Sequence, residues 1–144
     1  MSLQDPTRKM SKSEAEDSFI SVLDTPDIIR RKYRRAVTDS LAQVRFDTEN
    51  QPGVSNLLSI IAALTGESIE NVTAGFEGKG YGDLKAAVTD VTVETLAPIQ
   101  AEFARIMKDK KYMENVYRQG AERAGMLAER TLQKFMKKIG YVQK

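Results

Sequence analysis

The chain has 144 residues, of which 41% are hydrophobic and 29% are charged. This composition suits one domain with a buried core and excludes an intrinsically disordered chain. The absence of cysteine and histidine excludes disulfides, thiolate zinc sites, a cysteine nucleophile and a histidine base. No apolar run approaches the ~18 residues of a membrane helix, and no signal peptide opens the sequence, so we expect a cytoplasmic protein without a membrane partner.

The net charge of +2 is unevenly distributed along the chain. Residues 1–50 are neutral, with nine basic and nine acidic side chains, and residues 51–107 hold three basic and seven acidic ones. Residues 108–144 hold ten basic and four acidic side chains, which gives +6. Such a basic end indicates either a surface that faces a polyanion or a solvated helix face.

The N-terminal part predicts a loop and then a basic helix. Residues 1–17 are polar and aperiodic, and the apolar residues 18–23 predict a short strand or an extended segment. Thr25-Pro26-Asp27 places a capping hydroxyl, a proline and an acid in the order typical of a helix start. The helix carries a cluster of arginines that would suit an RNA backbone: Arg30, Arg31, Arg34 and Arg35.

Four further helices are predicted after the turn-rich residues 38–53. A helix from Val54 should end at Gly66, Ser68 should cap a short helix, and Asp83 should cap a long helix that Pro98 kinks. The last helix should end at Gly140 and carry a stripe at helical spacing whose small residues permit a neighbouring helix to approach closely: Met113, Val116, Gly120, Ala124, Leu127, Thr131, Phe135 and Ile139. The predicted fold is mainly α, a bundle of about five helices with an N-terminal loop and at most one short strand.

Two patterns suggest ligand sites but have simpler interpretations. The glycines of Gly78-Lys79-Gly80-Tyr81-Gly82 resemble a phosphate loop, but a short helix precedes them where a strand is required, which favours a helix–helix turn. Four acids match no metal-ligand spacing and are better explained as caps and turns. They are Asp24, Asp27, Asp39 and Asp47.

The sharpest chemical signal is Lys9-Met10-Ser11-Lys12-Ser13. Two lysines separated by small residues in a polar loop suit a polyphosphate, because lysine supplies a mobile point charge and serine hydroxyls donate hydrogen bonds. The alternative from spacing alone is a solvated basic loop.

These five residues are the full KMSKS signature and resemble the class I aminoacyl-tRNA synthetases. Further segments, in the same order, are similar to the bacterial and organellar tryptophanyl-tRNA synthetase family. They are residues 1–7, 36–40, 52–58, 77–82, 96–100 and 120–124. Glu14-Ala15-Glu16-Asp17 departs from the Asp-Pro-Asn that often follows the signature in that family.

The resemblance covers only the C-terminal part of such an enzyme, from just before the KMSKS loop. It implies that residues 1–24 are the KMSKS loop and a remnant of the catalytic domain, and that residues 25–144 are the anticodon-binding-like helical domain. The resemblance further implies that this chain lacks the Rossmann domain with the tryptophan pocket. The implied function is the C-terminal portion of a tryptophan–tRNA ligase that is inactive alone. The alternative is a stand-alone helical module that binds RNA or protein and keeps a vestigial loop.

The resemblance also implies roles for the loop residues. Lys12 would contact the pyrophosphate leaving group with help from Lys9, Ser11 and Ser13 would support the phosphates or the loop, and the Met10 backbone would lie near adenine. The substrates would be ATP with Mg2+, whose metal this chain does not ligate, tryptophan bound by the missing half, and tRNA(Trp). The parent would be a homodimer and the fragment a monomer. Tyr112 and Tyr117 are candidates for stacking on bases, against an alternative of half-buried packing.

Overall fold

The structure is a computed structural model that describes residues 1–141. It confirms a mainly α fold and contains no strand in that range. The prediction of a strand or extended segment over residues 18–23 is wrong, because Ser18 ends a 3-10 helix and Val22 and Leu23 form a turn that the Asp24 amide closes by donating to the Ser21 carbonyl. Five α-helices and one 3-10 helix follow in order: η1 (Glu16–Ser18), α1 (Pro26–Arg35), α2 (Pro52–Thr65), α3 (Ile69–Ala74), α4 (Tyr81–Lys108) and α5 (Lys110–Lys138). The chain divides between Gln100 and Ala101 into two compact units, which are described separately.

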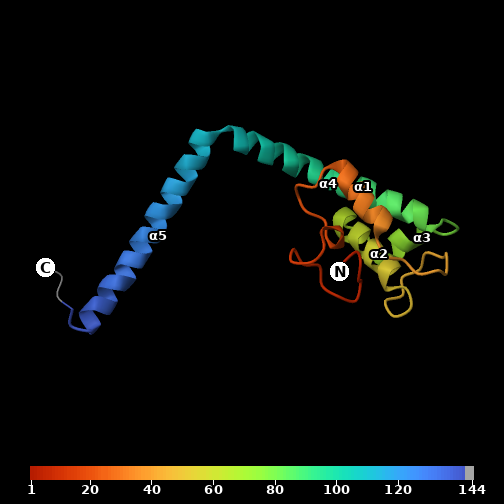
Figure 1. The fold of residues 1–144 in the computed structure, drawn as a ribbon, viewed down its shortest axis with the longest axis horizontal. Coiled ribbons are helices and arrows are strands. Elements are labelled where there is room, and N and C mark those ends of the chain that lie inside the picture. Colours follow the sequence, from red (N-terminus) through yellow and green to blue (C-terminus); the bar gives the residue numbers. More distant parts are fainter. Residues whose placement is uncertain (142–144) are drawn as a thin grey trace. The chain divides into compact units, whose positions relative to one another are not determined.

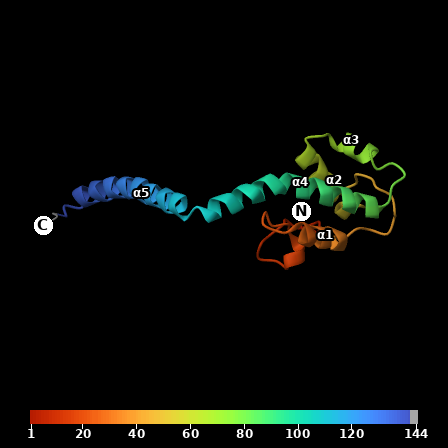
Figure 2. The ribbon, with the colours of Figure 1, turned by 90° about the horizontal axis from the view of Figure 1, so that it is seen from above.

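The first unit holds the hydrophobic core. Figures 1 and 2 show α1, α2 and α3 gathered against the beginning of α4. The core takes residues from each of these helices and from the N-terminal segment: Leu3, Ile29, Tyr33, Ala36, Val54, Leu57, Leu58, Ile61, Ala62, Val72, Leu84 and Val88. The hydroxyls of Tyr33 and Thr92 hydrogen-bond at 2.9 Å inside this core, which satisfies the polar tip of a buried ring.

Most of the predicted helix ends are confirmed. The Thr25 hydroxyl accepts a hydrogen bond from the Ile28 amide, and the Ser68 hydroxyl accepts one from the Asn71 amide. Gly66 ends α2 with a φ of 77°, the left-handed conformation that favours glycine. These caps are local, so the sequence alone is enough to place them.

Gly53, in the first turn of α2, makes a closer approach to other backbone than any other glycine of the described chain. A Cβ atom built on it would lie 2.1 Å from the carbonyl oxygen of Val37, so no side chain fits there. The Val37 amide in turn donates to the Leu3 carbonyl at 2.9 Å. The N-terminal segment, the end of α1 and the start of α2 are therefore pinned together.

The long helix begins earlier than predicted. Asp83 is not its N-cap, because α4 starts at Tyr81 and Asp83 is its third residue. The Asp83 carboxylate reaches back to accept the Gly80 amide at 3.0 Å, so the acid still satisfies a free N–H at this helix end. The helix continues through Pro98 to Lys108.

The second unit consists of the end of α4 and α5. Asp109 separates the two helices and caps α5 by accepting the Tyr112 amide at 2.9 Å. The stripe residues from Met113 to Phe135 do lie on one helix, but no residue of α5 is buried, so no neighbouring helix covers the stripe within the described chain. Tyr112 is 50% exposed, which agrees with half-buried packing, whereas Tyr117 is 68% exposed and lies mostly in solvent. No helix in residues 1–141 has the length and apolarity required to cross a membrane.

Candidate functional site

The loop Lys9–Ser13 lies on the surface between the N-terminal segment and η1. Lys9, Lys12 and Ser13 are exposed, whereas Met10 is partly buried and packs against the core. The Ser11 and Ser13 hydroxyls hydrogen-bond to each other at 2.8 Å. Among the described residues, neither lysine forms a salt bridge, so both ammonium groups are available to a ligand in solution.

The two ends of this loop are joined at its base. Arg8 precedes the loop and Glu14 follows it, and their side chains pair at 3.0 Å. The Arg8 amide donates to the Asp5 carbonyl at 2.9 Å, and the Ser2 amide donates to the Arg8 carbonyl at 2.8 Å. Glu14, part of the unusual acidic stretch, is therefore half of the closure of the loop.

The arginine cluster of α1 is largely neutralised within the chain. Arg30 pairs with Asp27 at 2.9 Å, and Arg31 and Arg35 both pair with the acids that follow the loop. Only Arg34 of the four has no acidic partner within residues 1–141. The charge count therefore overstated how much of this helix is free to face a polyanion.

The four acids considered as metal ligands do not gather in one place. Asp24 accepts the Ser21 amide, Asp39 accepts the Leu41 amide, and Asp47 accepts the amides of Glu49 and Asn50. The interpretation as turn and cap residues is confirmed for these three, and Asp27 lies in the first turn of α1, where it pairs with Arg30. Residues 1–141 hold no cluster of three or more acids, histidines or cysteines suited to a metal ion.

A buried hydrogen-bond network, which the sequence reasoning missed, lies beside α2 and α4. Gln51 is 2% exposed, and its amide nitrogen donates to the Gln43 carbonyl and the Tyr81 hydroxyl, each at 2.9 Å. The Tyr81 hydroxyl donates to Asp39. Burial alone would raise the pKa of Asp39, but hydrogen bonds from Tyr81, Leu41 and Gln51 outweigh it and lower that pKa.

This network joins parts of the chain that the sequence separates widely. Asp39 lies before α2, Gln51 directly precedes it, and Tyr81 opens α4. Burial and the neighbouring Asp39 carboxylate raise the pKa of the Tyr81 phenol, so the phenol stays protonated and keeps donating. No local sequence signal could have found a contact between residues 42 positions apart.

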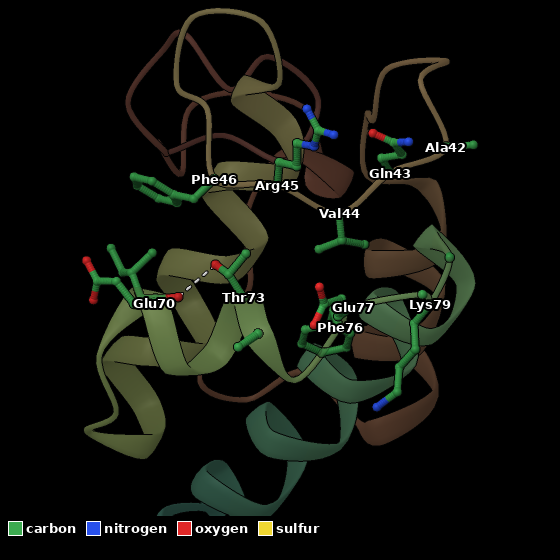
Figure 3. Close-up of a pocket in the computed structure, with 14 residues that line it drawn as sticks. Ala42, Gln43, Val44, Arg45, Phe46, Glu70, Thr73, Phe76, Glu77 and Lys79 are labelled. Atoms are coloured by element: carbon green, nitrogen blue, oxygen red, sulfur yellow. Dashed lines mark hydrogen bonds between the residues drawn. The ribbon is translucent and has the colours of Figure 1, made fainter.

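A cavity of about 920 Å3 lies between the loop before α2, the helix α3 and the glycine turn. Figure 3 shows Arg45 and Phe46 on one side and Glu77 and Lys79 on the other, with Val44 between them. Because Glu70 also lines the cavity, its two acids balance its two bases, and it has no bias towards a polyanion. The glycine turn joins α3 to α4, which confirms the helix–helix interpretation.

Comparison with known proteins places these observations in a family. The family model for "tRNA synthetases class I (W and Y)" matches residues 1–97. A tryptophan–tRNA ligase of Clostridium perfringens is 46% identical over 143 residues, which cover 99% of this chain and 43% of the relative. One from Enterococcus faecalis is 42% identical over 145 residues, covering 100% of this chain and 43% of the relative.

A solved structure gives the same result. The crystal structure of tryptophanyl-tRNA synthetase from Mycoplasma pneumoniae matches with a TM-score of 0.78 and 35% identity, covering 97% of this chain and 43% of that one. The chain thus spans less than half the length of these relatives. On the match over residues 1–97 and on these identities, the chain belongs to the class I tRNA synthetases of the tryptophan and tyrosine type, a family of enzymes.

Proposed function

We propose that this chain supplies the ATP loop and the helical tRNA-binding part of a tryptophan–tRNA ligase. The similarity to tryptophan–tRNA ligases over 99% of the chain supports this activity. One observation carries the assignment of ATP binding to the loop. Lys9 and Lys12 are exposed, and neither has an acidic partner among residues 1–141. Such lysines suit the dispersed charge of a triphosphate.

The reaction has two steps. In the first, the carboxylate of tryptophan attacks the α-phosphate of ATP, a new P–O bond forms, and the bond to pyrophosphate breaks. Negative charge grows on the leaving pyrophosphate, so a cation that meets it there lowers the barrier. We assign this contact to Lys12, with Lys9 assisting. In the second step the aminoacyl group passes to the 3′-terminal adenosine of tRNA(Trp), with release of AMP.

The other loop residues support this geometry. The linked hydroxyls of Ser11 and Ser13 steady the turn that carries Lys12. Met10 anchors the loop because its side chain packs against the core, which leaves its backbone to lie along the adenine. ATP enters with Mg2+, and this chain does not ligate the metal. Tryptophan and the remainder of ATP are bound by another part of the enzyme.

The two parts of the chain have different roles. Residues 1–24 belong with the catalytic centre, and residues 25–144 form the helical domain that receives tRNA. The complete enzyme is a cytoplasmic homodimer, and the isolated chain is a monomer without activity.

One observation favours a second function. Tyr112 and Tyr117 are at least half exposed on a basic helix, an arrangement that suits stacking on RNA bases. The chain would then be a stand-alone RNA-binding module with a vestigial loop. If the chain does not bind RNA even at low salt, a module that binds a protein is favoured instead.

Tryptophan-dependent pyrophosphate exchange tests the first function. The chain alone should show no exchange, and mixing it with the remaining part of the Clostridium perfringens ligase should restore a measurable rate. In that mixture, Lys12→Ala should slow adenylate formation by ~100- to 1000-fold, because the contact is made mainly in the transition state. A loss confined to the tryptophan Kd would contradict the role given to Lys12. Exchange by the chain alone would contradict the division between two parts.

A further inference from the structure

The acidic stretch after the loop docks onto one face of α1. The Arg35 guanidinium donates to the Asp17 carboxylate at 2.7 Å. Arg31, one turn earlier on the same face, lies 3.6 Å from Asp17 and 3.7 Å from Glu16. The hydrogen bond from Arg35 lowers the pKa of Asp17, so this carboxylate is charged at neutral pH.

Asp24 attaches the same segment to α1 at a second point. Lys32 is fully buried and pairs with Asp24 at 2.7 Å, and its ammonium lies 4.9 Å from the centre of the Phe19 ring. The Gln100 amide of α4 donates to the carbonyl oxygens of Val22 and Asp24 at 2.8 and 2.9 Å. Residues 16–24, which we call the tether, are thus held by α1 at two points and by α4 at a third.

The tether begins two residues after Glu14, which closes the loop with Arg8. The backbone from Lys9 to Ser13 therefore starts at Arg8, which Glu14 holds, and leads into the tether, which α1 holds. A shift of the tether along α1 would move Ser13 and Lys12 with it, since only Glu14 and Ala15 lie between Ser13 and η1.

We infer that Arg31, Lys32 and Arg35 are positioning residues: through Asp17 and Asp24 they fix where Lys9 and Lys12 present their charge, and they do not themselves face RNA or ATP. This inference rests on the proposed function, in which the two lysines meet a triphosphate. It also gives a role to the departure from Asp-Pro-Asn, because Asp17 lies in the segment that departs.

The pairs differ in how much they should contribute. The Lys32–Asp24 pair is shielded from water, whereas Arg35 is 62% exposed in its side chain and Asp17 is 25% exposed. Losing the exposed pair should therefore loosen the loop without unfolding the unit, and this makes it the better target. Exposed pairs of this kind change an equilibrium by roughly two- to fivefold.

The experiment uses the full chain with inorganic tripolyphosphate as the probe, in 0.15 M salt to screen distant charges. Two single variants, Asp17→Asn and Arg35→Gln, break the same pair but change the net charge in opposite directions. If α1 positions the loop, both should speed amide hydrogen exchange of residues 9–13, and both should raise the tripolyphosphate Kd by about two- to fivefold. The reversed pair, Asp17→Arg with Arg35→Asp, should recover part of the affinity.

Arg34→Gln is the matched control, because it removes the same charge from the same helix at a residue without an ion pair to the tether. It should leave the exchange of residues 9–13 unchanged. The inference is overturned if Asp17→Asn tightens binding while Arg35→Gln weakens it and loop exchange stays constant, since charge alone would then explain both.

Failure of the proposed function has a different signature. If replacing Lys9 and Lys12 with alanine leaves the tripolyphosphate Kd unchanged, the loop is not a phosphate site. The tether is then judged by amide exchange alone, which does not depend on the probe. Thermal unfolding of each variant, followed by circular dichroism, shows that the unit remains folded.

Discussion

Two basic regions of this chain, α1 and the segment from Lys108 through α5, look alike in sequence and differ in the structure. On α1, Arg30, Arg31, Lys32 and Arg35 all meet carboxylates. In the described part of the second region, Arg118 pairs with Glu114, while Lys108, Lys110 and Lys111 meet no acid. The charges of the first set are paired within the first unit, whereas these three lysines of the second region face solvent.

The difference comes from where the acids lie. Asp24 lies 8 positions before its partner Lys32, and Asp17 lies 18 positions before its partner Arg35. The chain turns back after the tether, so that α1 lies against these acids. In the described part of the second unit, the sequence offers no acidic segment that returns to Lys108–Lys111 as the tether returns to α1. A count of charges along a sequence cannot distinguish these cases, because pairing depends on the path of the chain.

The largest expected effect tests the buried member of the paired set. Lys32→Met should destabilise the first unit by about 3 kcal/mol, because it leaves Asp24 with an unpaired charge in a place that water barely reaches. Urea denaturation measures this change. Arg34→Gln on the same helix should cost less than about 0.5 kcal/mol. Equal losses in the two variants would mean that burial of Lys32 does not matter.

Two glycine substitutions compare the packed first unit with the exposed helix α5. Gly53→Ala should cost about 2 kcal/mol or more, because the new Cβ meets the Val37 carbonyl. Gly120→Ala on α5 meets nothing within 4 Å and should stabilise that helix by about 0.5 to 1 kcal/mol. Thermal unfolding by circular dichroism distinguishes them by sign. A penalty at Gly120 would indicate a neighbour packed on α5.

RNA binding tests the free set directly. Replacing Lys108, Lys110 and Lys111 together by alanine should weaken RNA binding by about tenfold at low salt. It should also flatten the salt dependence, by about 0.9 in the log–log slope for each phosphate that the variant no longer neutralises. Arg31→Gln with Arg35→Gln should change both quantities much less. The measurement is a filter-binding titration at several salt concentrations. Equal effects from the two variants would remove the distinction between paired and free charges.

The smallest effect concerns pH. Because the folded pKa of Asp17 is lowered, its contribution to stability is complete above its ordinary pKa of 3.8 and is lost as the pH falls through the lower folded value. Wild type and Asp17→Asn should therefore differ in stability at neutral pH and converge below pH 3.8. Urea midpoints across pH 2 to 7 check this. If the stability difference between wild type and Asp17→Asn grew as the pH fell, the ionised Asp17 would not stabilise the fold.

Sequence reasoning succeeded where structure is local. Thr25, Ser68 and Gly66 act within one helical turn, so their residue types were enough to place three helix ends. Asp83 was misplaced by a similar argument, since the same carboxylate can serve as an N-cap or, two residues inside the helix, bond back to Gly80. Residue type predicts that an acid belongs near a helix start and does not fix its position.

The candidate site was predicted in part. Lys9–Ser13 could be singled out because its signature is contiguous, and no structure was needed to name its residues. Its support could not be predicted, because Asp17 reaches Arg35 across 18 positions. The separate network beside α2 escaped prediction for the same reason, since Asp39 reaches Tyr81 across 42 positions. The stripe of α5 was predicted only in part, since helical periodicity predicts an apolar face but not what covers it.

The close approach of Gly53 to Val37 has a consequence for how this chain can change over evolution. It fixes the two ends of the connection between α1 and α2, and the bond between Val37 and Leu3 strengthens that fixed point. An insertion at Ala42, which is exposed and lies between the contacts of Leu41 and Gln43, can then lengthen the connection without moving either helix. Doubling such a connection costs only about 0.6 kcal/mol in closure entropy. Insertions between family members should therefore collect in this loop, while the lengths of the segments that flank it stay constant.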